Sequence, residues 1–346
     1  MKPIRVLIVE DSAVVREHLR RIISSDPRLH VAGMAATGEE ALAVIDRVAP
    51  DVVTMDLRLP GMQGLEVTRR IMAYRPTPIV VVSGLASEDV SLTMDALKAG
   101  ALSVVEKPAA ASHQDYEAMA ARLCVQLAIM SDVKVVRQRT NGMRSPRVYA
   151  GGLPRVYRVL GVATSTGGPN ALMELFTSLG AGFSLPVAVV QHMTPGFMDG
   201  FAEWLAGVIP LNLSVIRART LMTPGHVYLA PCEHHLIVDG PFAMLDDRPP
   251  VSTHRPSATV LFSSMARTMG AAGIGVLLTG MGEDGAEGLG ELRAAGGYTI
   301  AEDETTAVVY GMPGAAVRLG AAAESLPLGE IAPRVNELVS TRSEGV

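Results

Sequence analysis

Cysteine and long apolar runs are scarce in this chain, and each scarcity excludes a class of protein. Only two cysteines occur among 346 residues, Cys124 and Cys232. They form no disulfide framework, which fits a chain of the reducing cytoplasm. The first apolar run, Val6–Val9, is too short for a signal peptide and is followed at once by Glu10 and Asp11. No apolar stretch reaches the roughly 18 residues of a membrane span, so we expect a cytoplasmic protein without direct membrane insertion.

An excess of positive charge is also missing. The chain carries 30 lysines and arginines against 35 aspartates and glutamates, a formal net charge of −5. Nucleic-acid-binding domains are usually basic, and the sequence has no helix-turn-helix pattern, so we expect no nucleic-acid partner. The chain is instead 48% hydrophobic and long enough for two domains, each with a core of its own.

Residues 1 to 125 alternate short apolar runs with segments of helical spacing. This alternation is typical of a parallel, doubly wound α/β sheet, in which chemistry collects at the carboxyl ends of the strands. The expected strands are Val6–Val9, His30–Ala35, Val52–Met55, Ile79–Val82 and Leu102–Val105. The expected helices are Ala13–Ile23, Glu39–Val48, Leu65–Ala73, Asp89–Ala99 and Gln114–Met130.

The ends of these strands carry charged and hydroxyl residues: Glu10, Asp11, Asp56, Ser83 and Lys107. Carboxylates that converge on one sheet edge repel each other unless a cation lies among them, and Mg²⁺ suits such a site. Asp56 can then accept a phosphoryl group, while Ser83 hydrogen-bonds that group and Lys107 neutralises its charge. Each carboxylate alone could be a helix N-cap, but the whole set in this order favours phosphoryl chemistry.

On these residues the first domain resembles a response-regulator receiver domain, because an acidic pair, an acceptor aspartate, a hydroxyl residue and Lys107-Pro108 match in order. The resemblance implies a flavodoxin-like fold and phosphorylation of Asp56 by a chemotaxis histidine kinase. It also implies Mg²⁺ as the cofactor of phosphorylation. The implied metal site consists of Glu10, Asp11, Asp56 and Arg58.

Residues 126 to 155 are expected to be a linker. Seven basic residues and one acid lie between Asp132 and Arg158, together with scattered glycines and prolines. Such a composition is typical of a flexible connector. Solvation explains its charge, and an acidic docking partner is the alternative.

Residues 156 to 346 return to the alternation of strands and helices and predict a second, mostly parallel doubly wound α/β domain. The expected strands are Tyr157–Ala163, Val187–Gln191, Leu213–Ile216, Val227–Ala230, Ile274–Leu278 and Tyr298–Ala301. A hairpin is expected from His234–Val238 and Phe242–Leu245. The expected helices are Gly168–Leu179, Phe197–Ile209, Ala258–Met269, Gly285–Ala295 and Gly329–Ser340.

Three strand ends of this second domain carry Ser165, His192 and Asp284. A serine hydroxyl is a poor nucleophile until an imidazole takes its proton, and a carboxylate can orient that imidazole. Gly167–Gly168 and Gly280 let main-chain N–H groups approach an oxyanion. Taken singly, Ser165 and Asp284 could be helix caps and His192 a buried structural histidine. The order serine, histidine, aspartate also differs from that of α/β-hydrolases.

A longer set of motifs resembles the catalytic domain of the chemotaxis-type (CheB-type) protein-glutamate methylesterases. The motifs are Ser165-Thr166-Gly167-Gly168-Pro169, Gln191-His192-Met193, His254-Arg255-Pro256-Ser257, Leu278–Ala286 and Gly311-Met312-Pro313. The resemblance implies a catalytic triad of Ser165, His192 and Asp284. It implies oxyanion contacts at Thr166 and Met281 and no cofactor for the esterase reaction. Two positions depart from the family pattern: Thr164, where alanine is common, and Thr259, where aspartate often stands.

Together the two resemblances imply a phosphorylation-activated serine hydrolase. Its substrates would be glutamate methyl esters on chemoreceptors, with methanol as the product, and the resemblance also allows deamidation of receptor glutamines. The alternative is a catalytically weak receiver and docking module that competes for phosphoryl groups in a two-component pathway, and the intact triad argues against it. A metal site at Cys232-Glu233-His234-His235 is disfavoured, because adjacent histidines on a strand point to opposite faces.

Overall fold

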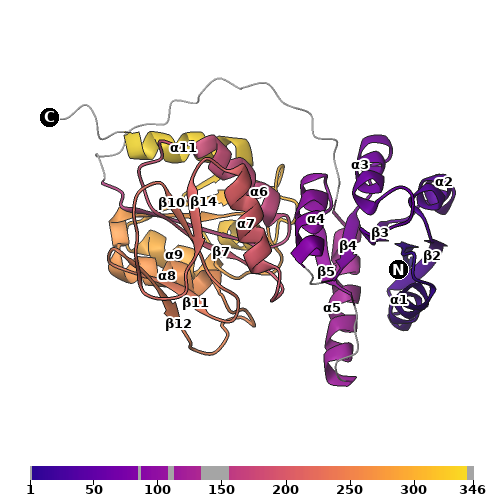
Figure 1. Cartoon of the computed structure of the whole chain (residues 1–346). Coiled ribbons are helices and arrows are strands. Elements are labelled where there is room, and N and C mark those ends of the chain that lie inside the picture. The colour runs from indigo at the N-terminus through magenta and orange to yellow at the C-terminus, as the bar shows by residue number, and fades with distance from the viewer. Residues whose placement is uncertain (1, 85–86, 108–112, 134–155, 341–346) are drawn as a thin grey trace. The chain divides into compact units, whose positions relative to one another are not determined.

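A computed structural model describes residues 2–84, 87–107, 113–133 and 156–340 of the chain (Figure 1). The chain divides into two compact units, Met1–Gln138 and Arg139–Val346, and each unit is described by itself. None of the helices in the described ranges combines the length and the hydrophobicity that a membrane span needs.

The first unit is built on a five-stranded parallel sheet in the order β2-β1-β3-β4-β5. β3 and β4 are buried along their whole length and are almost entirely apolar, as expected for strands covered on both faces. The strand order is flavodoxin-like, as predicted, and its direction reverses between β1 and β3. The strands are β1 (Ile4–Val9), β2 (Leu29–Ala35), β3 (Val52–Met55), β4 (Ile79–Ser83) and β5 (Ser103–Glu106).

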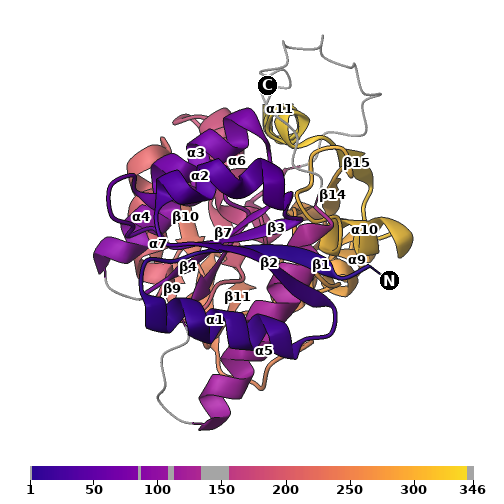
Figure 2. The same cartoon turned by 90° about the vertical axis from the view of Figure 1, so that its right-hand side faces the viewer.

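Helices cover both faces of this sheet (Figure 2). α1 and α5 pack together on one face, and α2, α3 and α4 cover the other. Ser12 and Thr37 begin α1 and α2 by accepting hydrogen bonds from main-chain N–H groups of the first turn. All the strands and helices predicted for this unit are confirmed, with ends shifted by at most two residues. The helices are α1 (Ala13–Ser25), α2 (Gly38–Val48), α3 (Gly64–Tyr74), α4 (Ser87–Lys98) and α5 (His113–Ser131).

The last helix of this unit extends past residue 125, where we placed the start of the linker. Leu127 and Met130 lie on α5 and are fully buried. Apolar side chains that are removed from water contribute to the packing of the unit, so the first domain continues to at least Ser131. The stretch 134–155 of the predicted linker lies outside the described residues.

The second unit contains a seven-stranded parallel sheet in the order β15-β14-β13-β6-β7-β10-β8. β6 lies at its centre between β13 and β7, and all three of these strands are buried throughout. The chain runs outward in opposite directions from β6 and β13, so the topological switch point lies between them. The strands are β6 (Val159–Thr164), β7 (Val187–Gln191), β8 (Asn212–Val215), β10 (His226–Leu229), β13 (Gly273–Leu277), β14 (Tyr298–Glu302) and β15 (Glu324–Leu326).

Two groups of helices enclose this sheet (Figure 1). α6 packs against α7 and α11 on one face, and α8 packs against α9 on the other. A small antiparallel sheet, ordered β11-β12-β9, lies against α8 and contains the predicted hairpin. These elements are α6 (Gly168–Leu179), α7 (Met198–Val208), α8 (Ala258–Thr268), α9 (Ala286–Ala294), α11 (Leu328–Ser340), β9 (Thr220–Leu221), β11 (His235–Asp239) and β12 (Phe242–Asp246).

Every strand and helix predicted for the second unit is confirmed, again with ends shifted by at most two residues. Four elements were not predicted: β9, β15, the short helix α10 (Met312–Arg318) and the 3₁₀ helix η1 (Gly270–Ala272). Each is too short to show a hydrophobic period of its own, because two or three residues complete no repeat and seven complete only two helical turns. The predicted α/β class of both units is therefore confirmed.

Candidate functional site

Ser165 lies in the tight turn that joins the central strand β6 to helix α6. Its main-chain N–H donates to the carbonyl of Thr279 on the neighbouring strand end (3.0 Å), and Thr164 Oγ donates to the same carbonyl (2.8 Å). Thr164 therefore adds a cross-strand bond that the alanine common in the family cannot make. The turn needs glycine at Gly167, because φ there is +81° and a Cβ would lie 2.7 Å from a side-chain carbon of Val308.

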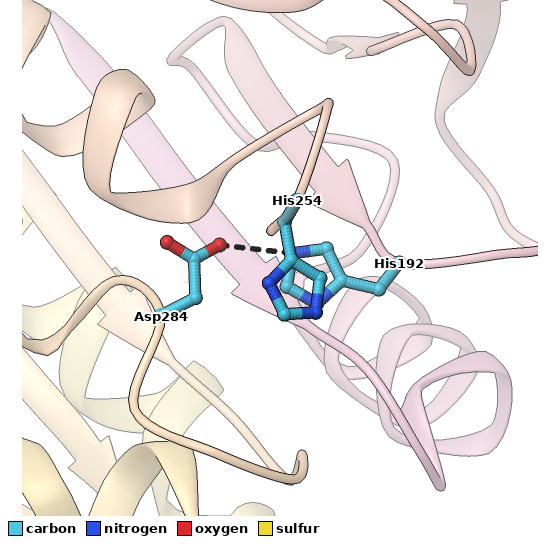
Figure 3. A group of neighbouring side chains, drawn as sticks. All are labelled: His192, His254 and Asp284. Carbon is cyan, nitrogen blue, oxygen red and sulfur yellow. Dashed lines mark hydrogen bonds and ion pairs between the residues drawn. The ribbon is translucent and has the colours of Figure 1, made fainter. Parts of the chain in front are cut away.

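His192 follows β7 and Asp284 follows β13, the two strands that flank β6. His192 Nε2 lies 2.9 Å from Asp284 Oδ2, and both side chains are largely removed from solvent (Figure 3). The strand pairing brings these residues together although they are 92 positions apart in the chain. The prediction that His192 and Asp284 meet at one sheet edge beside the Ser165 turn agrees with this geometry.

Asp284 is held by the amino-terminal end of α8. One carboxylate oxygen accepts from Ser257 Oγ (2.7 Å) and from the N–H of Thr259 (3.1 Å), and the other accepts from the N–H of Ala258 (2.7 Å). Asp284 does not cap the helix that follows it, because Gly285 occupies the N-cap position of α9. Thr259, a departure from the family pattern, accepts from the Gly285 N–H (2.8 Å) and ties the same two helix starts together.

This environment keeps Asp284 charged. Burial alone would raise the pKa of the carboxyl group, but hydrogen bonds from His192, Ser257 and Ala258, together with attraction to His192, hold the pKa well below its usual range. The partial positive charge at the α8 amino terminus acts in the same direction. A carboxylate fixed in this way can orient an imidazole and stabilise the imidazolium that forms during proton transfer.

The hydrogen bond to Asp284 sets the tautomer of His192. An ionised carboxylate can only accept, so Nε2 carries the hydrogen and Nδ1 keeps a lone pair. His192 Nδ1 is buried and has no hydrogen-bond partner within the described ranges. This nitrogen is therefore the one available to take a proton from a nucleophile.

The ring of His254 stacks on the ring of His192, with centroids 4.1 Å apart and planes 13° from parallel (Figure 3). The ligand atoms of His192, His254 and Asp284 are close enough to suggest a metal ion. An imidazole binds metal in the plane of its ring, however, and two stacked planes share no such position. The stack therefore supports a role for His254 in holding the His192 ring rather than in binding a metal.

Thr166 and Met281 are the predicted oxyanion contacts, and both lie at this edge of the sheet. Within the described ranges their main-chain N–H groups donate to no other backbone group. The Thr166 carbonyl accepts from Thr279 Oγ (2.8 Å), and Gly280 lies so close to Ser165 that a Cβ there would come within 2.8 Å of the serine Cβ. Free amides beside a nucleophile suit an oxyanion site, and this assignment remains a prediction.

One buried acid beside the site was missed from the sequence. Glu302, at the end of β14, accepts from the Thr279 N–H (2.7 Å) and from Thr306 Oγ (3.0 Å). Burial, with a smaller contribution from the charges of Glu174 and Asp303, raises the pKa of Glu302 to about 7, although the hydrogen bonds from Thr279 and Thr306 act to lower it. Its position directly after a hydrophobic strand, next to the strand that leads to Asp284, was the sequence signal that could have found it.

The first unit gathers its predicted residues at the ends of β1, β3, β4 and β5. Glu10, Asp11 and Asp56 each offer a carboxylate oxygen, and these oxygens lie within 4.8 Å of one another. Glu10 and Asp56 are buried and Asp11 is exposed. Burial and the charge of Asp56 raise the pKa of Glu10, which indicates an unfavourable concentration of negative charge. A divalent cation fits this oxygen-rich site.

Lys107 offsets part of that charge. Its Nζ lies 2.8 Å from Asp56 Oδ2 and 3.0 Å from Glu10 Oε2. Burial would lower the pKa of Lys107, but its hydrogen bond to Asp56 and the charges of both carboxylates raise it. Ser83 is buried, and its carbonyl accepts from the Lys107 N–H (2.9 Å). Arg58 donates its main-chain N–H to Asp56 (3.3 Å), and only its main-chain carbonyl could bind a cation.

Comparisons with known proteins give a family for each of the two units. Residues 160–335 match the family described as CheB methylesterase, and residues 6–115 match the family described as response regulator receiver domain. A protein of Paramagnetospirillum magneticum, named protein-glutamate methylesterase/protein-glutamine glutaminase 2, is 48% identical over 97% of this chain and 98% of its own length. A protein of Nitrosospira multiformis with the same name, without the number, is 44% identical over 99% of this chain and 98% of its own.

A solved structure is also similar. The Thermotoga maritima CheB methylesterase catalytic domain is 34% identical to this chain and superimposes with a TM-score of 0.51. The match covers 53% of this chain and 99% of that domain. The methylesterase family match, residues 160–335, lies within the second unit and includes Ser165, His192 and Asp284.

Proposed function

Because the chain belongs to the CheB methylesterase family, we propose that it hydrolyses glutamate methyl esters on methyl-accepting chemoreceptors and releases methanol. The observation that carries this proposal is the 2.9 Å hydrogen bond between His192 and Asp284 on the two strands that flank the Ser165 strand. A nucleophile, a base and an orienting acid on adjacent strand ends suit acyl transfer.

In the first half of the reaction, Ser165 Oγ attacks the ester carbonyl while His192 Nδ1 takes the serine proton. Asp284 stabilises the imidazolium, and the N–H groups of Thr166 and Met281 donate to the oxyanion. The C–O bond to the methoxy group then breaks, and His192 returns its proton to the departing methanol. The glutamyl group remains on Ser165 as an ester.

In the second half, water attacks the acyl-enzyme with His192 again as the base. The bond to Ser165 breaks, the serine recovers its proton, and a glutamate carboxyl group leaves. A glutamine side chain can follow the same course with ammonia in place of methanol. Protein-glutamine deamidation is therefore proposed as a second activity of the same residues.

The first unit supplies the proposed control. A chemotaxis histidine kinase donates a phosphoryl group to Asp56, and the resulting aspartyl phosphate increases esterase activity. Glu10, Asp11, Asp56 and the Arg58 carbonyl would hold Mg²⁺, which neutralises charge on the phosphoryl oxygens when it is bound. Ser83 donates a hydrogen bond to the phosphoryl group, and Lys107 changes partner from the free carboxylate to a phosphoryl oxygen.

Substitution of the nucleophile tests the reaction. Ser165→Ala should reduce methanol release from methylated receptor membranes to background, because no other residue carries the acyl group. Ser178→Ala is the matched control, since Ser178 is an exposed serine on the helix that follows the same turn, and it should keep full activity. Methanol release by Ser165→Ala at the rate of the unsubstituted chain would contradict the proposal.

A further inference from the structure

Gln191 is the last residue of β7 and has 2% of its surface exposed. Its Nε2 donates to the main-chain carbonyl of Ser165 (2.9 Å) and to the main-chain carbonyl of His192 (2.8 Å). An amide nitrogen has two hydrogens, so both are used on the backbone of the proposed nucleophile and the proposed base. In the described part of the chain, no other side chain forms hydrogen bonds to the main chain of both Ser165 and His192.

The partners fix the orientation of this amide. If the group were turned over, Oε1 would face two carbonyl oxygens and no hydrogen would lie between them. Oε1 is buried against Gly168 and has no hydrogen-bond partner within the described ranges. A Cβ at Gly168 would lie 2.1 Å from Oε1. The second glycine of the Ser165 turn therefore makes room for the Gln191 side chain.

The paired part of β6 and β7 ends at Thr164 and Gln191. The two hydrogen bonds from Gln191 connect the chain segments that follow this last pair. The His192 N–H donates to the Thr164 carbonyl (3.0 Å), and the Ser165 N–H donates to Thr279 on β13. Without Gln191, the Ser165 carbonyl would keep only the hydrogen bond from the Gly168 N–H within its own turn (2.9 Å). The bond from Gln191 thus ties the Ser165 carbonyl to β7, and among the described residues no other hydrogen bond ties that carbonyl to β7.

We infer that Gln191 is a positioning residue, which fixes the Ser165 peptide relative to the His192 peptide without touching substrate. The inference rests on the proposed esterase function only for the substrate used in the assay. The hydrogen bonds of Gln191 do not depend on that function. Small displacements of a nucleophile from its base cost large factors in rate, because the reacting atoms must lie close and aligned. Loss of the Gln191 amide should therefore act on kcat and leave receptor binding unchanged.

Gln191→Met keeps the length of the side chain and removes both donors. In the full chain with methylated receptor membranes, we expect kcat to fall about tenfold or more and KM to change less than about threefold. Thr299→Val is the matched control, because Thr299 is fully buried in β14 of the same sheet and its Oγ donates to the Ala321 carbonyl (2.8 Å). It should lose thermal stability without loss of kcat. Equal losses of kcat in the two variants, or no loss in Gln191→Met, would overturn the inference.

Gln191→Glu provides a second readout if the methionine variant does not fold. A carboxylate at this position has no hydrogen to donate, whereas its protonated form regains one O–H donor. The ratio of kcat for Gln191→Glu to kcat for the unsubstituted chain should therefore rise as the pH falls from 8 towards 5. A ratio that is flat with pH would contradict a positioning role that acts through donation.

A fluorophosphonate probe separates this inference from the proposed function. Ser165 attacks the phosphorus, fluoride leaves, and the covalent adduct reports the reactivity of the nucleophile without any receptor. Labelling of Gln191→Met should be slower than labelling of the unsubstituted chain and of Thr299→Val by about the same factor as kcat. If the unsubstituted chain labels but releases no methanol from receptors, the proposed substrate is wrong and the positioning role stands. If labelling of Gln191→Met is as fast as in the unsubstituted chain, the positioning role is wrong.

Discussion

At the scale of single residues, Asp284 combines two tasks that are usually separate. It accepts four hydrogen bonds, one from His192 and three from Ser257, Ala258 and Thr259 at the start of α8. Its lowered pKa keeps it ionised, and therefore an acceptor, around neutral pH. The same carboxylate therefore orients the His192 imidazole and completes a helix amino terminus.

Asp284→Asn should lower kcat by about three to four orders of magnitude, the effect of the corresponding change in serine proteases. An asparagine presents an NH₂ group to the donors that surround Asp284. His192 Nε2–H then loses its acceptor, and nothing fixes the tautomer of the imidazole. KM should change little. Methanol release kinetics measure both constants. Asp303→Asn, which changes a carboxylate bonded to the Thr305 N–H after the neighbouring strand β14, should keep kcat within about threefold. A kcat for Asp284→Asn above a tenth of the normal value would argue against the assigned role.

The raised pKa of Glu302 predicts how the stability of the folded chain depends on pH. Its pKa is about 7 in the folded chain and 4.5 in the unfolded chain, so between these values the folded chain holds a proton that the unfolded chain has lost. The contribution of Glu302 to the free energy of unfolding is fully present below pH 4.5 and falls by up to about 3 kcal/mol as the pH rises to 7. Glu302→Gln should remove this slope. Urea unfolding of both proteins at pH 5 to 8 measures it. Identical pH dependence of the two midpoints would show that the carboxyl group does not titrate in this range.

At the scale of elements, the site depends on the start of α8, which supplies three of the hydrogen bonds to Asp284. Ser257 caps this helix by accepting from the Val260 N–H and also donates to Asp284. Ser257→Ala should cost about 1 to 2 kcal/mol of stability and lower kcat about tenfold, since a cap and a bond to the orienting acid are both lost. Melting temperature and methanol release are the two measurements.

Thr37→Ala is the control for this substitution, because Thr37 caps α2 in the first unit through the Glu40 N–H and touches no catalytic residue. It should lower stability by a similar amount and leave kcat unchanged. If Thr37→Ala reduced kcat as strongly as Ser257→Ala does, the loss would come from general destabilisation and not from the α8 amino terminus.

The sequence predicted these elements better than it predicted the contacts between them. β3, β7 and α6 were located to the residue because apolar runs of the right length end at polar or glycine residues. The strand ends then followed, and with them Ser165, His192 and Asp284. The bonds from α8 to Asp284, the His254 stack and the Gln191 amide were not predicted. Each is a contact between a side chain and a peptide group or ring that is distant in the sequence. Local hydrophobic periodicity carries no information on such contacts.

At the scale of the whole molecule, the two units have separate sheets, separate cores and separate sites. Phosphoryl chemistry at Asp56 can affect Ser165 only through a coupling between the units. We predict that residues 150–346 alone release methanol faster than the unphosphorylated full chain, by a factor between about 5 and 150 if the coupling is of the usual size. Methylated receptor membranes provide the assay, and Ser165→Ala in the shorter chain provides the blank. Equal rates would mean that the first unit exerts no inhibition.

The same assay tests the phosphoryl site in the full chain. A small acyl phosphate with Mg²⁺ should raise methanol release towards the rate of residues 150–346, and it should have no effect on those residues alone. Asp56→Asn should remove the stimulation and keep the basal rate, because the substituted amide cannot form an acyl phosphate. Removal of Mg²⁺ with a chelator should do the same, since the carboxylates of Glu10, Asp11 and Asp56 would then repel the incoming phosphoryl group. Stimulation that persists in Asp56→Asn would place the acceptor elsewhere, while a chelator that lowered the basal rate as well would show that the esterase site itself depends on metal.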